Sequence, residues 1–338
     1  MTLRYWHMTL PPATVMIETP LDLRRALEEV RSSGEVPLYT LEPASHDGTT
    51  RREAARVIHV EAPSSAGSAW YDRHGRLLRL EASATDLTGA RLLYLSYLML
   101  EAQLHRRGFV TLHAAAVARD GWAVVLLGPA GAGKTTTAIR LCREHGCELT
   151  GNDLVVVGGR ERVSTVAGSA RLRLRYSSIA RVLPELLGLF PAAVTDPWRT
   201  KVDVTPDRVG VAAAQNPAEV AAVVFVHVDN GYPNLVVGPG DSLVHRLNLY
   251  ENALRYIRAV STPWLLDGSG GYGPFMPSLD DPLAHAARTV TLTRLLERSR
   301  YVAGPPATVA AHIASLLPAG PPATQPGREA QRCSPLRS

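Results

Sequence analysis

LLGPAGAGKTTTAIRLC, which runs from Leu126 to Cys142, reads as an apolar strand, a glycine-rich loop, a Lys-Thr pair and a helix. Gly128–Thr135 fits the pattern G-x-x-x-x-G-K-[ST], in which glycines let the backbone turn several N–H groups into one anionic pocket. The apolar run Trp122–Leu127 has the length of a strand, and Thr136–Glu144 has helical character. A chance match rarely lies between a strand and a helix, so this stretch predicts a phosphate-binding loop in an α/β fold.

Each residue type in the loop suits the binding of a nucleoside triphosphate, ATP or GTP, together with Mg²⁺. Lys134 would reach the β- and γ-phosphates, and the hydroxyl of Thr135 would hold the Mg²⁺ ion. The positive end of the dipole of the following helix would attract the same phosphates. The predicted nucleotide-binding residues are Gly128, Ala130, Gly131, Ala132, Gly133, Lys134, Thr135 and Thr136.

Lysine is rare in this chain. The sequence has two lysines, Lys134 and Lys201, and the remaining 34 of its 36 basic residues are arginine. A lysine that persists against such a bias indicates a position where a compact ammonium is needed and a planar guanidinium does not serve. Lys134 has such a role in the loop. Lys201, in WRTKVDV, is either a substrate or phosphate contact or an ordinary surface lysine.

Composition favours a globular protein. A chain of 338 residues with 46% hydrophobic content can build one large domain or two ordinary ones. The sequence has no run of eighteen apolar residues, and its N-terminal MTLRYWHMTLPP lacks the features of a signal peptide. We therefore expect a cytoplasmic protein with no membrane partner. Three cysteines, Cys142, Cys147 and Cys333, fit a reducing compartment and a structural rather than a zinc-binding role.

The charge of +5 permits an anionic ligand but does not favour nucleic acid, because the basic residues are spread out without interleaved aromatic side chains. The densest basic cluster is RLRLRYSS, in which Arg171, Arg173 and Arg175 alternate with leucines and share one face of a strand. This face is either solvated, as arginines mostly are, or an anion-facing wall near the nucleotide. In the second case Arg173 would contact substrate or phosphate.

The first 107 residues predict a small α+β layer that selects the acceptor. We expect residues 1–20 to be irregular and a helix within Pro20–Gly34, with Asp22 as its cap. The segment AWYDRHGRLLRLEA predicts a hairpin, and Leu87–Gly108 predicts a long helix with a wide apolar face.

Residues 108–317 predict the core that carries the loop. AAVVFVHVDN, from Ala221 to Asn230, is apolar throughout and predicts its central strand. The glycine-rich segment DGSGGYGP, residues 267–274, is either a mobile lid or a plain connector. Residues 318–338 have the composition of a disordered tail.

The stretch from Gly108 to Val157 resembles the HPr kinase/phosphorylase-like family, whose fold is related to PEP carboxykinase. It holds, in order, the Leu-His-Ala strand around His113, a short turn, an apolar strand, the loop and helix, and GND after a second strand. KVDV at Lys201 is similar to a Lys-x-Asp segment of kinase-like members, whereas the longer C-terminal signature of true HPr kinases is missing. The resemblance implies a P-loop mixed-sheet α/β core of HPr kinase/PEP carboxykinase type, in a divergent member preceded by the α+β layer.

The resemblance also implies roles for single residues. His113 matches the active-site histidine of the family, and Lys134 and Thr135 match its nucleotide and Mg²⁺ ligands. Asp153 matches the second member of an acidic pair that anchors the metal and removes the proton of the attacking hydroxyl. The first member is Asn152 here, so either Asp153 does both tasks or another residue, first of all His113, is the base. Asn152 then becomes a candidate substrate or phosphate contact.

Plainer roles stand beside these: His113 could be a packed strand histidine, and Asp153 a turn residue at the end of a strand. On balance we expect His113, Asp153 and Lys134 to be catalytic and Thr135 and Asp153 to hold Mg²⁺.

The expected activity is a Mg²⁺-dependent kinase. It would transfer the γ-phosphate of ATP or GTP to a hydroxyl of a small molecule (a nucleoside, sugar or serine) or of a peptide serine, in a natural-product pathway as the resemblance implies. The alternative is a nucleotide-binding regulator or sensor without phosphoryl transfer, which the missing carboxylate at Asn152 favours. Relatives often form oligomers, so a homo-oligomer is a further expectation.

Overall fold

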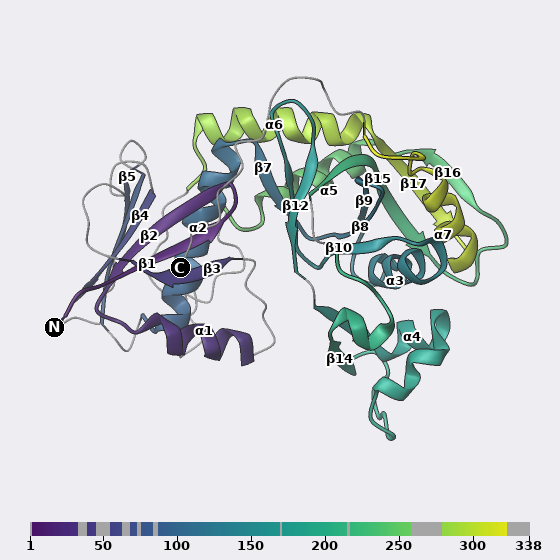
Figure 1. Ribbon diagram of the computed structural model, residues 1–338, viewed down its shortest axis with the longest axis horizontal. Helices are drawn as coiled ribbons and strands as arrows, with labels where there is room; N and C mark the ends of the chain where they lie inside the picture. The colour runs from purple at the N-terminus through teal and green to yellow at the C-terminus, as the bar shows by residue number, and fades with distance from the viewer. Residues whose placement is uncertain are drawn as a thin grey trace.

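The computed structural model describes residues 2–32, 39–44, 55–62, 68–72, 76–83, 87–169, 171–214, 217–257 and 279–322. These residues form a mixed α/β fold built on two large sheets, one in each of two lobes (Figure 1). The glycine-rich segment 267–274 lies outside the described residues, as does the tail from residue 323 onward. No helix in the described part of the chain combines the length and apolar character that a membrane span requires.

The N-terminal lobe is a six-stranded mixed sheet with two helices. Its strands lie in the order β3-β1-β2-β4-β6-β5. They are β1 (Arg4–Leu10), β2 (Ala13–Thr19), β3 (Thr40–Pro43), β4 (Ala55–Glu61), β5 (Ser68–Asp72) and β6 (Leu77–Ala82), and the helices are α1 (Leu23–Ser32) and α2 (Gly89–Arg106). α2 shares one apolar core with this sheet and is buried over most of its length.

The expectation of irregular structure over residues 1–20 is wrong. β1 and β2 form an antiparallel hairpin that joins at Leu10 and Ala13. Trp6, Met8 and Leu10 alternate along β1 and are buried, which is the period of a half-buried strand. The helices and the hairpin predicted for this lobe are confirmed: α1 begins after Asp22, which accepts a hydrogen bond from the Arg24 N–H, and β5 and β6 form the hairpin. The selection of an acceptor by this lobe stays a prediction.

The second lobe is a nine-stranded sheet between two pairs of helices. Its strands are β7 (Phe109–Leu112), β8 (Ala115–Arg119), β9 (Trp122–Leu127), β10 (Glu148–Asn152), β11 (Val155–Gly158), β12 (Ser164–Gly168), β15 (Ala218–Val228), β16 (Val236–Pro239) and β17 (Ser299–Gly304). The helices are α3 (Lys134–His145), α5 (Leu243–Leu254), α6 (Pro282–Glu297) and α7 (Pro306–Ser315).

A smaller unit projects from this lobe at the lower right of Figure 1. It holds the two-stranded ribbon of β13 (Leu172–Arg175) and β14 (Lys201–Val204) and the helix α4 (Tyr176–Val182). Two 3₁₀ helices, η2 (Pro184–Leu189) and η3 (Pro206–Val209), complete it.

β15 is the central strand of the nine-stranded sheet, as its apolar sequence predicts. It pairs in parallel with β9 and β17 and in antiparallel fashion with β12. Val224 and Val226 belong to the core beneath α3 and α7, whereas Val223 and Phe225 belong to the core beneath α5 and α6. The sheet is therefore buried on both faces, and β9 delivers the phosphate-loop sequence at the carboxyl edge of its parallel strands.

β7 and β8 follow each other along the chain with a short break between them, and so do β10 and β11. The two breaks lie next to each other in the sheet. β7 pairs with β11 up to Leu112 opposite Val155, and β8 pairs with β10 from Ala115 opposite Asn152. The two pairings keep one antiparallel register across residues 113–114 and 153–154, which therefore form a shared interruption, and a bulge between Leu149 and Gly151 shifts the register further along β10. The predicted residues His113 and Asp153 therefore lie in the same gap of the sheet.

A buried carboxyl joins the two lobes next to this gap. Glu101 of α2 is 1% exposed and accepts hydrogen bonds at 2.5 Å from the hydroxyls of Tyr97 and of Thr111 on β7. Burial raises the pKa of Glu101 from 4.5 to about 7, against the hydrogen bonds of Thr111 and Tyr97, which lower it. One turn further along α2, the Nδ1 of His105 lies 3.1 Å from a guanidinium nitrogen of the fully buried Arg288 on α6.

The free energy of unfolding of Glu101→Gln should increase relative to that of the wild type as the pH rises from 5 to 8. Because the folded-state pKa is raised, the contribution of Glu101 to stability is complete below pH 4.5 and is lost as the pH rises through about 7. Glutamine keeps an acceptor and cannot ionise. One pKa unit corresponds to about 1.4 kcal/mol, so the relative gain should be on the order of 2–3 kcal/mol in the free energy of unfolding, measured with urea. A difference between the two proteins that stays constant over this range would contradict the prediction.

Candidate functional site

The phosphate-loop sequence forms the turn between β9 and α3. Its glycines are required by the backbone, because φ is +95° at Gly133 and +146° at Gly128. A Cβ at Gly133 would lie 2.7 Å from the Cβ of Val228 at the end of β15, and the Val228 N–H donates to the carbonyl of Ala132 at 3.0 Å. The loop is thus held closely against the neighbouring parallel strand, and α3 begins without a side-chain cap on its N–H groups.

Lys134 is a nearly buried cation at the start of α3. Its ammonium donates to the carbonyl oxygens of Gly128 at 2.8 Å and of Pro129 at 3.2 Å, and the residue is 8% exposed. Burial lowers the pKa of Lys134 from 10.5, and the charge of Asp153 opposes this shift. The amine therefore lies over the turn of the loop, where it can exchange these carbonyls for phosphate oxygens.

Thr135 and Asn152 join α3 to the end of β10. The Thr135 hydroxyl donates to Oδ1 of Asn152 at 2.8 Å, and Nδ2 of Asn152 donates to the carbonyl of Arg171 at 3.2 Å. Asn152 is fully buried, and its backbone carbonyl accepts a hydrogen bond from the Ser169 hydroxyl. Both ends of the amide are thus used, which a carboxylate at this position could not achieve without protonation.

His113 and Asp153 lie near each other and near Lys134. Burial, followed by the positive charge of Lys134, lowers the pKa of His113 below 6.5, whereas the Asp153 carboxylate and a hydrogen bond to the backbone of Asp153 raise it. Asp153 has φ of +65°, a conformation that Asp tolerates better than most residues and that concentrates at functional sites. The structure therefore brings three predicted catalytic residues, His113, Lys134 and Asp153, into one electrostatic cluster.

The oxygen atoms of this cluster suit Mg²⁺. Thr135 offers a hydroxyl, Asn152 an amide oxygen and Asp153 a carboxylate, and Mg²⁺ takes oxygen ligands with only one or two protein carboxylates. In the described part of the chain, no three His, Cys, Asp or Glu side chains gather as a metal site of their own. The donor set fits a metal ion whose remaining ligands come from phosphate and water.

Arg173 and Lys201 lie outside this cluster, on the β13–β14 ribbon. Arg173 pairs with Asp203 at 3.0 and 3.2 Å, and Lys201 lies opposite Arg175 in the register. Arg173 and Lys201 are exposed, which agrees with a solvated face. The ribbon reaches the loop through the carbonyl of Arg171 that Asn152 contacts, and the role of both side chains as phosphate contacts stays a prediction.

Two residues at the end of α5 contribute to the cluster and carry no signal in the sequence: Asn252 in the helix and Arg255 directly after it. The Asn252 amide contacts the backbone of His113, and the charge of Arg255 lowers the pKa of His113. Asn252 is 139 residues away from His113 and belongs to no motif. Only the packing of α5 on the sheet shows that this helix takes part in the site.

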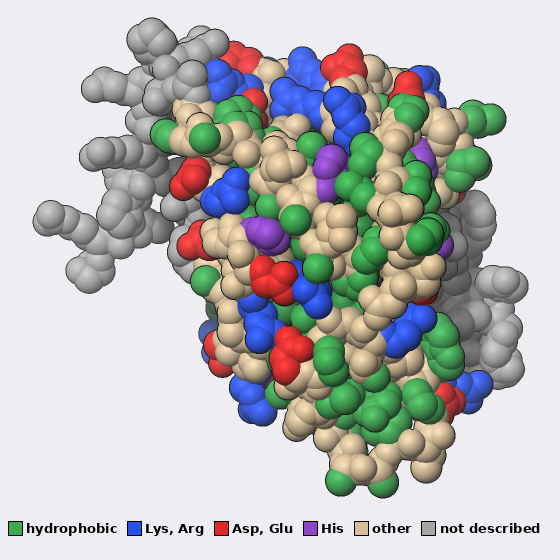
Figure 2. Space-filling view, turned by 90° about the vertical axis from the view of Figure 1, so that its right-hand side faces the viewer, with side chains coloured by type: hydrophobic (Ala, Val, Ile, Leu, Met, Phe, Trp, Pro, Cys, Tyr) green, Lys and Arg blue, Asp and Glu red, His purple; other side chains and the backbone are tan. Residues whose placement is uncertain are grey.

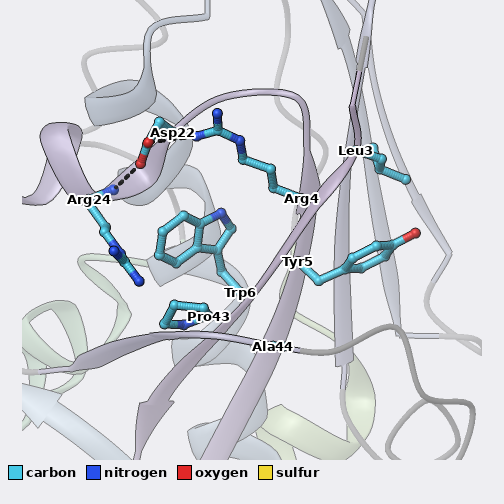
Figure 3. Close-up of a pocket in the computed structure, with 8 residues that line it drawn as sticks. All are labelled: Leu3, Arg4, Tyr5, Trp6, Asp22, Arg24, Pro43 and Ala44. Atoms are coloured by element: carbon cyan, nitrogen blue, oxygen red, sulfur yellow. Dashed lines mark hydrogen bonds and ion pairs between the residues drawn. The ribbon is translucent and has the colours of Figure 1, made fainter.

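A second hollow lies in the N-terminal lobe. It has a volume of about 420 Å³ and is lined by Leu3, Arg4, Tyr5, Trp6, Asp22, Arg24, Pro43 and Ala44 (Figure 3). Arg4 pairs with Asp22 at 2.6 Å across it, and the Arg24 guanidinium lies 5.9 Å from the ring centre of Trp6. None of these eight residues belongs to the cluster at the loop.

The surface drawn in Figure 2 carries both signs of charge. Lys and Arg side chains on this face are interspersed with Asp, Glu and apolar side chains. Ion pairs between charges of opposite sign also occur at the surface of the loop-bearing lobe, among them Arg143–Glu185, Arg181–Asp229 and Arg173–Asp203. The absence of a nucleic-acid partner stays a prediction.

Comparison with known proteins gives little. No protein-family model matches the chain, and no curated protein matches it. Among solved structures, the Hpr(Ser) kinase/phosphatase from Coxiella burnetii matches at 20% sequence identity, over 38% of this chain and 77% of that chain, with a TM-score of 0.22. At this TM-score, neither a fold relationship, a family nor an activity follows from the match.

Replacing Asn152 with Asp should destabilise the protein by about 1–3 kcal/mol in the free energy of unfolding at pH 7. The carboxylate would lose the donor to the Arg171 carbonyl in a fully buried place. Asn230→Asp is the matched control, since the Asn230 amide also donates to a backbone carbonyl, that of Arg181, but is exposed to water. Equal costs for the two variants in urea denaturation would show that the Asn152 amide is not a structural requirement.

Proposed function

We propose that this protein is a Mg²⁺-dependent phosphotransferase of the HPr kinase-like type. It binds ATP or GTP at the loop from Gly128 to Thr136 and transfers the γ-phosphate to a hydroxyl of a small molecule or of a peptide serine. The observation that carries the proposal is the gathering of Lys134, Thr135, Asp153 and His113 around one loop at the carboxyl edge of β9 and β15.

Phosphoryl transfer needs mainly positioning and charge neutralisation, and this cluster offers both. The loop glycines bring backbone N–H groups and the positive end of α3 to the phosphates. Lys134 would neutralise charge on the β- and γ-phosphates. Thr135 and Asp153 would hold Mg²⁺, with the amide oxygen of Asn152 beside them; when bound, this ion draws charge from the transferring phosphoryl group.

A single carboxylate leaves the base role to His113 in this proposal. Burial and Lys134 lower the pKa of His113, so its ring is neutral at pH 7 and has a lone pair for the proton of the acceptor hydroxyl. Asp153 then serves as the metal ligand. The buried amide of Asn152 supports this division, because its two hydrogen bonds suit an amide rather than a second carboxylate.

The second candidate function is a nucleotide-binding regulator that transfers no phosphate. One observation favours it: Asn152 lies against the Thr135 hydroxyl, where the resemblance to the kinase family leads us to expect a carboxylate. A regulator would bind ATP or GTP with Mg²⁺ and label no acceptor.

Transfer of labelled γ-phosphate from ATP or GTP tests the main proposal. The acceptor pool should hold free serine, serine-ending peptides, nucleosides and sugars. We expect label on one acceptor class, and a loss of about 100-fold or more in Lys134→Ala, because charge stabilisation by one positioned group is typically of this size. Arg143→Ala is the matched control, since Arg143 is a basic residue of the same helix that pairs with Glu185 at the surface.

Nucleotide that binds tightly without label on any acceptor, and without Lys134-dependent hydrolysis, would favour the regulator over the kinase. Equal rates in the wild type and in Lys134→Ala would show that the label arises elsewhere.

The pH dependence of the transfer rate tests the role of His113. The rate should fall as the pH falls below 6.5, towards the lowered pKa of His113, because the protonated ring accepts no proton. His113→Gln should lose about 100-fold or more in rate at pH 7 and should no longer show this decline. His145→Gln, at the far end of α3, should keep both the rate and the profile. A decline that persists in His113→Gln would assign it to another group.

A further inference from the structure

The backbone of His113 lies where the sheet gives it no strand partner. The pairing of β7 ends at Leu112 opposite Val155, and that of β8 begins at Ala115 opposite Asn152. Residue 113 would continue this ladder opposite residue 154, but the strands separate at this level. A buried backbone N–H or C=O without a partner is costly, so the break needs a substitute.

Asn252 of α5 supplies that substitute. Its Oδ1 accepts a hydrogen bond from the backbone N–H of His113 at 2.6 Å, and its Nδ2 donates to the backbone carbonyl of His113 at 3.2 Å. One side-chain amide thus makes the two bonds that a neighbouring strand would make. The contact joins residues 139 positions apart and binds the helix to the gap.

The chemistry of this contact calls for asparagine. Only Asn and Gln carry a donor and an acceptor in one plane, as a peptide group does. Asp could accept from the N–H of His113 but would set a carboxylate oxygen against its carbonyl. α5 is anchored by the buried Leu249, Ala253 and Leu254, so the amide is held at a fixed height over the gap.

The same end of α5 also acts on the ring of His113. The charge of Arg255, three residues beyond Asn252, is one of the causes that lower the pKa of His113. Lys134 lowers it from the opposite element, α3, and Asp153 raises it from the strand break. The ring is therefore surrounded by groups from α3, α5 and the β10–β11 break, and its position among them depends on where its backbone is held.

We propose that Asn252 is a positioning residue, which holds the backbone of His113 in the strand break and so sets the place of its ring between Lys134 and Asp153. The structural part of this proposal needs no enzymatic activity. Its kinetic consequence rests on the proposed phosphotransferase function, so the test has one readout for each part.

The variants are Asn252→Ala, which removes both bonds, and Asn252→Asp, which keeps an acceptor for the shorter bond and secures a folded comparison. Asn248→Ala is the matched control, because Asn248 lies one turn earlier on α5 and is exposed. The first readout is hydrogen exchange of the His113 backbone N–H in the full chain, followed by NMR and assigned by comparison with His113→Gln. The second is the transfer rate and the dissociation constant of the nucleotide.

Asn252→Ala should make exchange of the His113 backbone N–H about 10-fold faster, because this N–H loses its hydrogen bond to Oδ1 of Asn252. The transfer rate should fall about 10- to 100-fold, as displacement of a reacting group by about 1 Å can do, with the nucleotide dissociation constant within about twofold. Asn252→Asp should keep a rate between those of the wild type and of Asn252→Ala. Asn248→Ala should match the wild type in both readouts.

Exchange of the His113 N–H in Asn252→Ala at the wild-type rate would overturn the proposal. A transfer-rate loss that Asn248→Ala shares, or one that comes with an equal loss of nucleotide affinity, would also overturn it, since the helix would then act only as general support. If the wild type transfers no phosphate but exchange of the His113 N–H is still faster in Asn252→Ala, the positioning role stands and the proposed function fails.

Discussion

The requirement that buried backbone groups be paired shapes the site of this protein. The strands on the two sides of residues 113–114 and 153–154 keep one antiparallel register but separate at these residues. That separation frees His113 and Asp153 from the sheet and turns them towards Lys134 at the start of α3. The sheet provides rigidity on both sides of the gap, and α5 provides the hydrogen bonds that the gap lacks. Catalytic geometry here would rest on a local defect in an otherwise regular sheet.

The neutral amide of Asn152 is a second structural feature of this site. It links the Thr135 hydroxyl to the carbonyl of Arg171, and so ties the first turn of α3 to the base of the β13–β14 ribbon. A site of this kind holds one carboxylate, Asp153, and one neutral imidazole, His113, in place of a pair of carboxylates. The two groups differ in chemistry, so the carboxylate could hold a metal while the imidazole takes a proton.

Much of the fold could be predicted from sequence because its signals are local. The loop from Gly128 to Thr135 carries its own backbone chemistry, and the apolar β15 could only be a buried strand. Residues 1–20 were harder, since the two prolines that join β1 and β2 obscured the alternation of Trp6, Met8 and Leu10. The contact between Asn252 and His113 could not be predicted, because it depends on where α5 packs and on no spacing in the chain. The roles of Arg173 and Lys201 as phosphate contacts remain predictions, because these roles depend on a bound substrate or phosphate.

The junction between the lobes has a consequence for how the protein can be divided. α6 and its N-cap residue Asp281 contact the chain on both sides of the turn that follows α2. Arg106 pairs with Asp281 at 2.8 Å, and the Thr291 hydroxyl donates to the carbonyl of Gly108 at 2.8 Å. Arg288 is buried against His105 between these contacts. A cut at this turn would take the His105 contact away from the buried Arg288, which would keep its ion pair with Asp280, and would uncover the face of α6 that packs on α2. The N-terminal lobe therefore cannot be removed without disturbing the loop-bearing lobe. Mechanical strain on the N-terminal lobe would reach β7 first, close to His113.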